Sequence, residues 1–159
     1  MQEARLRRAM AADADVIAAI WLAGWRESHL DHVPEALVAA RTPTSFRTRA
    51  AQRIDDTTVA VTADAIAGFV MVVGAEVEQV YVDGANRGSG VAALLLDEAQ
   101  RVIAAAGHRM AWLAVIASNT RARRFYERRG WTDEGMFDYS AKTEGGSVLL
   151  PCHRYVRAV

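Results

Sequence analysis

The amino-acid sequence predicts an α+β fold, in which helices cover both faces of a mostly antiparallel sheet of about seven strands. Short apolar or β-branched segments separated by turn residues are typical of antiparallel strands that follow one another in the chain. Residues 88–106 have the apolar spacing of a helix and lie between two strand-like segments, 76–82 and 109–117. These three segments are therefore expected to form one strand–helix–strand crossover within the sheet.

The first third of the chain is expected to contain one strand and three helices. Alternating polar and apolar residues predict a strand over residues 4–10, and apolar residues at helical spacing follow it. Residue types that commonly begin a helix divide the rest of this region into three segments. The expected helix starts are Asp13, Pro34, and either Thr44 or Ser45 within a helical segment at 42–54.

The remaining segments complete the sheet. Strands are predicted at residues 57–62 and 65–73, joined in a hairpin at Ala63-Asp64. Two closing strands are expected on either side of a turn at residues 143–146. Pro151 lies in the second of these strands and should place it at an edge or a bulge of the sheet.

Length and charge indicate one ordinary globular domain that spans residues 1–159. The chain has 52% hydrophobic and 24% charged residues, and its 19 basic side chains balance 19 acidic ones. This balance disfavours nucleic acid and anionic membranes as partners, and no apolar segment is long enough to span a bilayer. The single cysteine, Cys152, excludes an internal disulfide and a cysteine-rich zinc site. We therefore expect a cytoplasmic protein that holds no metal.

Residues 82–101, VDGANRGSGVAALLLDEAQR, place three glycines between a predicted strand and a predicted helix. The first turn of a helix has unpaired N–H groups and partial positive charge, and glycines let a phosphate approach them closely. The segment Arg87-Gly88-Ser89-Gly90-Val91-Ala92 is therefore a candidate pyrophosphate site, although the same glycines also suit an ordinary turn.

One interpretation of the glycines is a dinucleotide site. Residues 88–93 fit the pattern G-x-G-x-x-A after a strand. That pattern requires an Asp or Glu about 20 residues further on, and none stands at the end of the next predicted strand. The interpretation of the chain as a nicotinamide-dependent oxidoreductase therefore rests on these six residues alone.

A second interpretation rests on two motifs. Arg87-x-x-Gly90-x-Ala92 resembles the pyrophosphate signature R/Q-x-x-G-x-G/A of the GNAT superfamily of N-acetyltransferases. Residues 119–131, NTRARRFYERRGW, are similar to the second signature of that family, N-x-x-A-x-x-F-Y-x-x-x-G-F/W. The order of predicted elements also resembles the family's along nearly the whole chain. Two departures are small: Ala92 replaces a commoner glycine, and Gly84 stands where a proline is frequent.

The resemblance implies a site for acyl-CoA in a V-shaped opening between the fourth and fifth strands. Backbone groups of Val80 and Val82 would pair with the pantetheine arm like an added strand, and residues 87–92 would hold the pyrophosphate. Asn119 would hydrogen-bond the same arm, and it also suits the cap of the helix that follows. The implied ligand set is Val80, Val82, Arg87, Gly88, Ser89, Gly90, Val91, Ala92 and Asn119.

The resemblance also implies direct attack of an amine on the thioester. Tyr126 is the expected general acid that protonates the departing thiolate, although by pattern alone it is an aromatic residue on the inner face of a helix. Glu76 is the expected general base, acting through water, because an alkyl ammonium group with a pKa of ~10 must lose its proton before it attacks. Glu78, Asp138 and Tyr139 remain alternatives for the base.

Two further groups allow a structural and a functional interpretation. Five arginines within residues 121–129 suit a solvated helix face, with one or two of them available to the 3′-phosphate of CoA. His29 and His32 fit a surface loop by default, or line an acceptor pocket together with Trp25 and Glu27.

The sequence therefore predicts an N-acetyltransferase that uses acetyl-CoA as co-substrate and a small-molecule or peptide amine as acceptor. Two other classes stay open: a catalytically silent acyl-CoA-binding module of the same fold, and the oxidoreductase. Dimers are common in the family that the chain resembles, so a homodimer is compatible with this reading.

Overall fold

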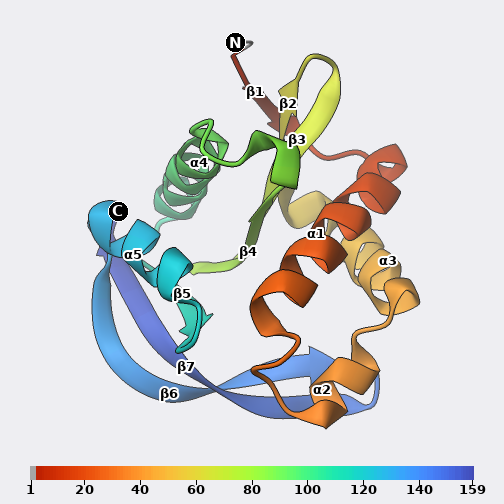
Figure 1. The fold of residues 1–159 in the computed structure, drawn as a ribbon. Helices are drawn as coiled ribbons and strands as arrows, with labels where there is room; N and C mark the ends of the chain where they lie inside the picture. Colours follow the sequence, from red (N-terminus) through yellow and green to blue (C-terminus); the bar gives the residue numbers. More distant parts are fainter. Residues whose placement is uncertain (1–2) are drawn as a thin grey trace.

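The computed structural model describes residues 3–159 and contains a seven-stranded sheet with strand order β1-β2-β3-β4-β5-β7-β6 (Figure 1). β4 and β5 are parallel, and the other neighbouring strands are antiparallel. The predicted α+β class and the crossover through a helix are confirmed. The strands are β1 (Arg5–Arg8), β2 (Thr57–Thr62), β3 (Ala65–Val73), β4 (Glu76–Val82), β5 (Met110–Ile116), β6 (Thr132–Thr143) and β7 (Gly146–Ala158).

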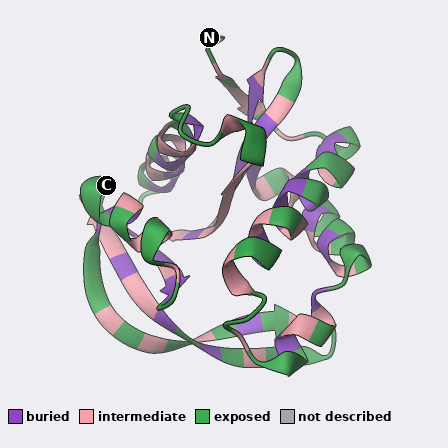
Figure 2. Cartoon of the chain, in the orientation of Figure 1, coloured by how far each residue is buried: buried purple, intermediate pink, exposed green. Residues whose placement is uncertain are grey.

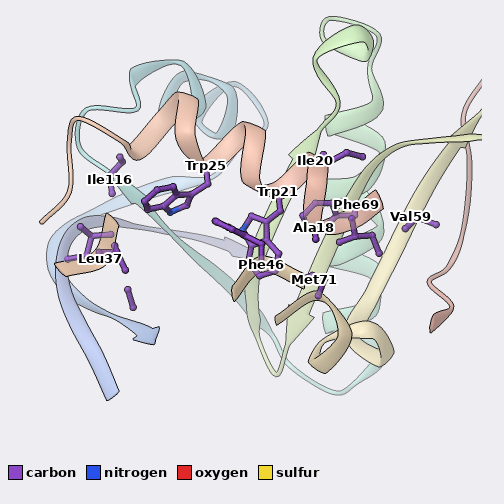
Figure 3. Packing of buried hydrophobic residues seen from close by; sticks show 14 of the residues in the cluster. Ala18, Ile20, Trp21, Trp25, Leu37, Phe46, Val59, Phe69, Met71 and Ile116 are labelled. Carbon is purple, nitrogen blue, oxygen red and sulfur yellow. The ribbon is translucent and has the colours of Figure 1, made fainter. Parts of the chain in front are cut away.

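Helices cover both faces of this sheet (Figure 1). α1 and α3 pack on one face around Trp21, Phe46 and Phe69 (Figure 3), and α4 and α5 pack on the other around Leu95 and Tyr155. Figure 2 shows the buried residues as patches along these helices and strands. None of the helices within residues 3–159 has the length and apolar character needed to cross a membrane. The helices are α1 (Ala14–His29), α2 (Glu35–Ala40), α3 (Pro43–Gln52), α4 (Val91–Ala105) and α5 (Thr120–Arg128), with short 3-10 turns η1 (Ala11–Asp13), η2 (Ile54–Asp56) and η3 (Gly84–Asn86).

The prediction that Asp13 caps α1 is wrong. Asp13 already has helical backbone angles, and its side chain makes no capping bond to α1. Its carboxylate instead accepts hydrogen bonds from the Met10 N–H group at 2.7 Å and from the Arg7 guanidinium at 2.8 Å. Asp13 therefore fixes the turn η1 and ties it to β1, since Arg7 belongs to that strand.

The cap of α3 also differs from the expectation. Thr42, and neither Thr44 nor Ser45, caps this helix, and Thr42 Oγ1 accepts a hydrogen bond from the Ser45 N–H group at 3.1 Å. Pro43 occupies the first helical position, where a missing N–H group leaves no bond unmade. The helix therefore starts two or three residues earlier than Thr44 or Ser45 suggests.

Two expectations about the sheet have different outcomes. Ala63 and Asp64 have φ values of 51° and 64°, as a two-residue hairpin turn requires, so the predicted hairpin is confirmed. β7 is an interior strand between β5 and β6, and its register with β6 is regular at Pro151, so the prediction of an edge strand or a bulge there is wrong. The last pair between β5 and β7 is Ile116–Cys152, however, so β5 ends before Pro151 and the proline faces no β5 residue.

β4 and β5 separate as soon as they meet. Their paired position is Glu76–Trp112, beside which the Trp112 N–H group donates to Ala75 O at 3.0 Å. Beyond Glu76, the side of β4 that faces β5 has no strand partner among the described residues. The two strands therefore diverge in the V shape that the resemblance implies.

A bulge in β4 decides which side chains enter this opening. The register with β3 shifts by one residue near Glu78. As a result Val77 and Val80 both pack on the α4 side of the sheet, whereas Tyr81 packs against the core beneath α1 and α3. Glu76, Glu78 and Tyr81 all line one cavity.

Candidate active site

A cavity of about 1080 Å³ lies where β4 and β5 diverge. Side chains of α1, α2, α3 and α5 and of the β6–β7 hairpin complete its wall. Its volume is at the upper end of the range that holds drug-sized ligands. Of the residues that the sequence assigns to the site, Glu76, Val80, Asn119 and Tyr126 line this cavity, although they come from distant parts of the chain.

Glu76 lies at the point where the two strands part, and it is half-buried. Tyr139 Oη, from β6, donates a hydrogen bond to Glu76 Oε2 at 2.5 Å. Burial raises the pKa of Glu76 above its usual value of 4.5, and the hydrogen bond from Tyr139 opposes this rise. A carboxyl group with a raised pKa is better matched to accept a proton near neutral pH, so the position suits the predicted base.

The alternative bases are less well placed. Glu78 lines the cavity, but its carboxylate pairs with Arg53 Nε at 3.3 Å, which compensates its charge. Asp138 is exposed and lies outside the cavity wall. Burial raises the pKa of Tyr139, so its hydroxyl is a hydrogen-bond donor to Glu76 at neutral pH.

Tyr126 approaches the cavity from α5, and it is only 8% exposed. Its ring packs edge-on against Phe125 and Trp131. Burial raises the pKa of Tyr126 above the usual value of 10.0, so its hydroxyl stays protonated at neutral pH. The residue is therefore both a packed aromatic, as its helical position predicts, and a proton donor with access to the cavity.

Asn119 serves as the cap of α5 and also faces the cavity. Its Oδ1 accepts a hydrogen bond from the Ala122 N–H group at 3.2 Å. One residue thus meets both uses that the sequence allows, because the capping bond occupies the carbonyl oxygen and leaves the amide NH₂ group for another partner.

The glycine-rich loop lies outside the main cavity, at the start of α4. Gly88 and Gly90 have φ values of 74° and 87°, in the region that favours glycine, and a Cβ atom on either would meet nothing within 4 Å. The first bonded N–H group of the helix belongs to Leu94 and donates to Gly90 O at 3.1 Å. Among residues 3–159 the N–H groups of residues 90–93 find no acceptor, so this open helix start suits an anion.

Arg87 and Val82 border a smaller hollow of about 260 Å³ between α1 and the glycine loop. Arg87 forms a bidentate pair with Glu27 of α1, with 2.6 Å between Arg87 Nη1 and Glu27 Oε1. The pair is partly exposed, so it is worth little in stability and can rearrange. A phosphate on this loop would compete with Glu27 for the guanidinium.

Some predicted participants lie elsewhere. Arg123 of α5 donates to Tyr155 Oη at 3.2 Å, and Arg129, directly after α5, pairs with Asp97 at 2.8 Å, so both have structural partners. His32 does not line the cavity.

His29 does line the cavity, contrary to the surface loop that is its default. Its ring stacks on Trp25 with 5.3 Å between ring centroids, and Ser28 Oγ lies 2.6 Å from its Nδ1 atom. Burial lowers the pKa of His29 to about 4, so the imidazole is neutral at physiological pH.

Three polar residues of the cavity have no motif in the sequence. Arg41, directly after α2, is 7% exposed, and the Arg49 guanidinium lies 4.3 Å from the ring centroid of Trp21. Tyr81 packs so closely against Gly24 of α1 that a Cβ atom there would overlap its ring. The spacing of Arg49 three residues after the buried Phe46 is the one signal that puts it on the inner face of its helix.

The tip of the β6–β7 hairpin forms a further wall. Residues 142–145 line the cavity, and the turn between the strands pairs Thr143 with Gly146. These residues are mostly exposed, so they lie at the cavity mouth.

Comparison with known families assigns this arrangement to the acetyltransferases. A family model described as the acetyltransferase (GNAT) domain matches residues 26–141. The chain belongs to the GNAT acetyltransferase family, as its two motifs predict, and the dinucleotide interpretation of residues 88–93 is set aside. A search of curated protein sequences gives no match.

Solved structures share the fold over the whole chain. The GCN5-related N-acetyltransferase of Rhodopseudomonas palustris is 21% identical, with 100% of this chain and 98% of that chain covered and a TM-score of 0.77. YncA of Salmonella typhimurium, solved with acetyl-CoA, is 16% identical with coverage of 98% and 94% and a TM-score of 0.71. PaiA of Thermoplasma acidophilum, solved with coenzyme A, is 14% identical with coverage of 99% of each chain and a TM-score of 0.70.

Proposed function

We propose that this protein transfers the acetyl group of acetyl-CoA to a primary amine, by direct attack within a ternary complex. The observation that carries the proposal is that Glu76 and Tyr126 line one cavity although they belong to different elements, a strand and a helix. Family membership supports acetyl transfer, and the fold-related structures solved with coenzyme A or acetyl-CoA support the choice of donor.

The donor fits the features that lie along the opening. The free N–H groups at the start of α4 would bind the pyrophosphate, because a helix start favours anions. The unpaired side of β4 near Val80 and Val82 would bind the pantetheine amides as an added strand does. Asn119 would donate its amide NH₂ group to the same arm. The thioester would then enter the cavity between Glu76 and Tyr126.

The two side chains would divide the proton transfers. Glu76, through a water molecule, would take the proton of the acceptor's ammonium group, since only the neutral amine has a lone pair. The amine nitrogen would bond to the thioester carbonyl carbon, and the carbon–sulfur bond would break. Tyr126 would give its proton to the departing sulfur, so that CoA leaves as the thiol. Cys152 also lines the cavity, but burial raises its pKa to about 12, so it is no nucleophile at neutral pH.

Steady-state assays with acetyl-CoA and a panel of small amines and peptides test this function. The expected result is release of free CoA thiol only when an amine is present, with an N-acetylated product identified by mass spectrometry. Saturable acetyl-CoA binding with no product from any amine would contradict the proposal and favour the catalytically silent binding module.

A further inference from the structure

The acceptor side of the cavity holds two cations that form no ion pair with any residue of the described chain, 3–159. Arg41 and Arg49 both line it, and neither forms a salt bridge within residues 3–159. Arg53 lines the same cavity, but it pairs with Glu78 at 3.3 Å and Asp56 at 3.8 Å. Glu76 and Glu144, the other carboxyl groups of the cavity wall, form no salt bridge with either arginine.

Arg41 and Arg49 are more buried than the other unpaired arginines of the described chain. Arg41 is 7% exposed and its Nε atom has no hydrogen-bond partner, and Arg49 is partly buried above Trp21. Five other arginines that lack a salt bridge or side-chain hydrogen bond are exposed, so water solvates them. They are Arg26, Arg109, Arg121, Arg124 and Arg128.

A buried guanidinium without a partner is costly for the folded protein. Burial lowers the pKa of Arg49 to about 10, and the nearby positive charge of Arg41 contributes to this shift. Burial also lowers the pKa of Arg41, which Tyr81 and Tyr139 oppose. The two positive charges repel each other, and their burial lowers the stability of the folded protein. Such a destabilising pair of like charges is typical of a binding site for an anion.

We propose that the acceptor is a compact amino acid whose carboxylate binds Arg41 and Arg49 while its amine faces Glu76. A guanidinium fork matches the two oxygens of a carboxylate. Tyr139 donates a hydrogen bond to Glu76 and also opposes the fall in the pKa of Arg41, so the anion site and the base both lie near this side chain. The predicted pyrophosphate residues 88–92 do not line this cavity, so the two arginines are not part of the pyrophosphate site. This inference rests on the proposed function.

Kinetics with matched acceptors test the inference. Each protein-forming L-amino acid is compared with its carboxamide, which keeps the amine and removes the negative charge. We expect kcat/KM for the preferred acid to exceed that of its carboxamide by about tenfold or more, mainly through KM. Arg41→Met and Arg49→Met should each remove this preference. Arg47→Met is the matched control, because Arg47 is exposed on α3 and bonds only Thr44.

Three results would overturn the inference: carboxamides used as well as acids, a preference that survives in Arg41→Met and Arg49→Met, or aminoalkyl phosphonates preferred over amino acids. Melting temperature distinguishes binding from a structural role. Arg41→Met should melt at or above the wild-type temperature, because it removes a buried unpaired charge and keeps a similar volume. A lower melting temperature would indicate that Arg41 supports the fold.

Binding of the reaction product separates this inference from the proposed function. N-acetyl amino acids and their amides are titrated calorimetrically into wild type and Arg41→Met. Acid-selective binding that Arg41→Met loses would support the anion site even if no amine is acetylated. Absence of acid-selective binding would overturn it even if acetyl transfer occurs.

Discussion

The side chains of Glu76 and Tyr126 have opposite proton-transfer properties, and burial produces both. Burial raises the pKa of each. For the carboxyl group this moves the titration towards neutral pH and favours a base, and for the phenol it prevents ionisation and favours an acid. The same physical effect therefore yields two complementary groups, because one starts below neutral pH and the other above it.

Replacement of Tyr126 by Phe should lower kcat about 100-fold or more, because the thiolate would depart without a proton donor. The ring packing and acetyl-CoA binding should persist, since only the hydroxyl is removed. Tyr155→Phe is the matched control: Tyr155 packs near Tyr126 with 6.1 Å between centroids, but it does not line the cavity. Steady-state kinetics give kcat and calorimetry gives acetyl-CoA affinity for both variants. An unchanged kcat in Tyr126→Phe would rule out Tyr126 as the general acid.

The pH dependence of kcat/KM should show the titration of Glu76. The base acts only when deprotonated, so activity should rise with pH through the raised pKa of Glu76, above 4.5. Tyr139→Phe removes the hydrogen bond that favours the carboxylate. The rise in kcat/KM, which is the acidic limb of the pH profile, should therefore move to higher pH. Glu76→Gln should abolish this pH dependence. Glu78→Gln should keep it but move it to lower pH, because the charge of Glu78 contributes to the raised pKa of Glu76. A limb that does not move in Tyr139→Phe would assign it to another group.

At the scale of the element, α4 offers a comparison between its two ends. Gly90 and Gly107 have φ values of 87° and 97°, and a Cβ atom on either meets nothing within 4 Å. Alanine at each position should therefore cost about 1 kcal/mol of stability from backbone strain. Only Gly90→Ala should also weaken acetyl-CoA binding, because its side chain projects beside the free N–H groups. Urea unfolding and calorimetry give both quantities, and equal affinity in the two variants would count against the phosphate site.

The sequence predicted best those elements whose ends depend on residues close by in the chain. The bounds of β2, β3 and β4 agree with residues 57–62, 65–73 and 76–82, because β-branched runs end at clear turn residues. Helix starts were less well predicted, since Asp13 and the residues of α3 had several hydrogen-bonding choices. Pro151 fits in an interior strand because β5 ends before it, which no pattern around the proline shows.

The residues of the candidate site also fall into a group that the sequence predicts and a group that it does not. The donor side follows from two motifs, so residues such as Tyr126 and Gly90 could be named from the sequence. On the acceptor side, Arg41, Arg49 and Tyr81 could not be predicted, because they come to one cavity only when the end of α2, α3 and β4 pack around it. Their spacing along the chain carries no information about that contact.

At the scale of the whole molecule, the sheet consists of two halves that barely pair. β4 and β5 share the single position Glu76–Trp112, so the two apolar cores and the crossover helix connect the halves. Acetyl-CoA bound in the opening should protect from hydrogen exchange those backbone amides of residues 77–82 that point towards β5 and not towards β3. Amides of the β2–β3 hairpin should not respond. Exchange measured by mass spectrometry tests this, and unchanged β4 protection at saturating acetyl-CoA would exclude the added-strand mode of binding.

The hairpin tip at residues 142–145 has a consequence for the evolution of this scaffold. Exposed loop tips tolerate insertion and deletion far better than strands do. This tip borders the cavity mouth, whereas the helix start that would hold the donor lies outside this cavity. Lengthening or shortening it would reshape the entrance for acceptors and leave the transfer chemistry intact. Descendants of one ancestral enzyme could thus acquire new acceptors by changes in loop length alone.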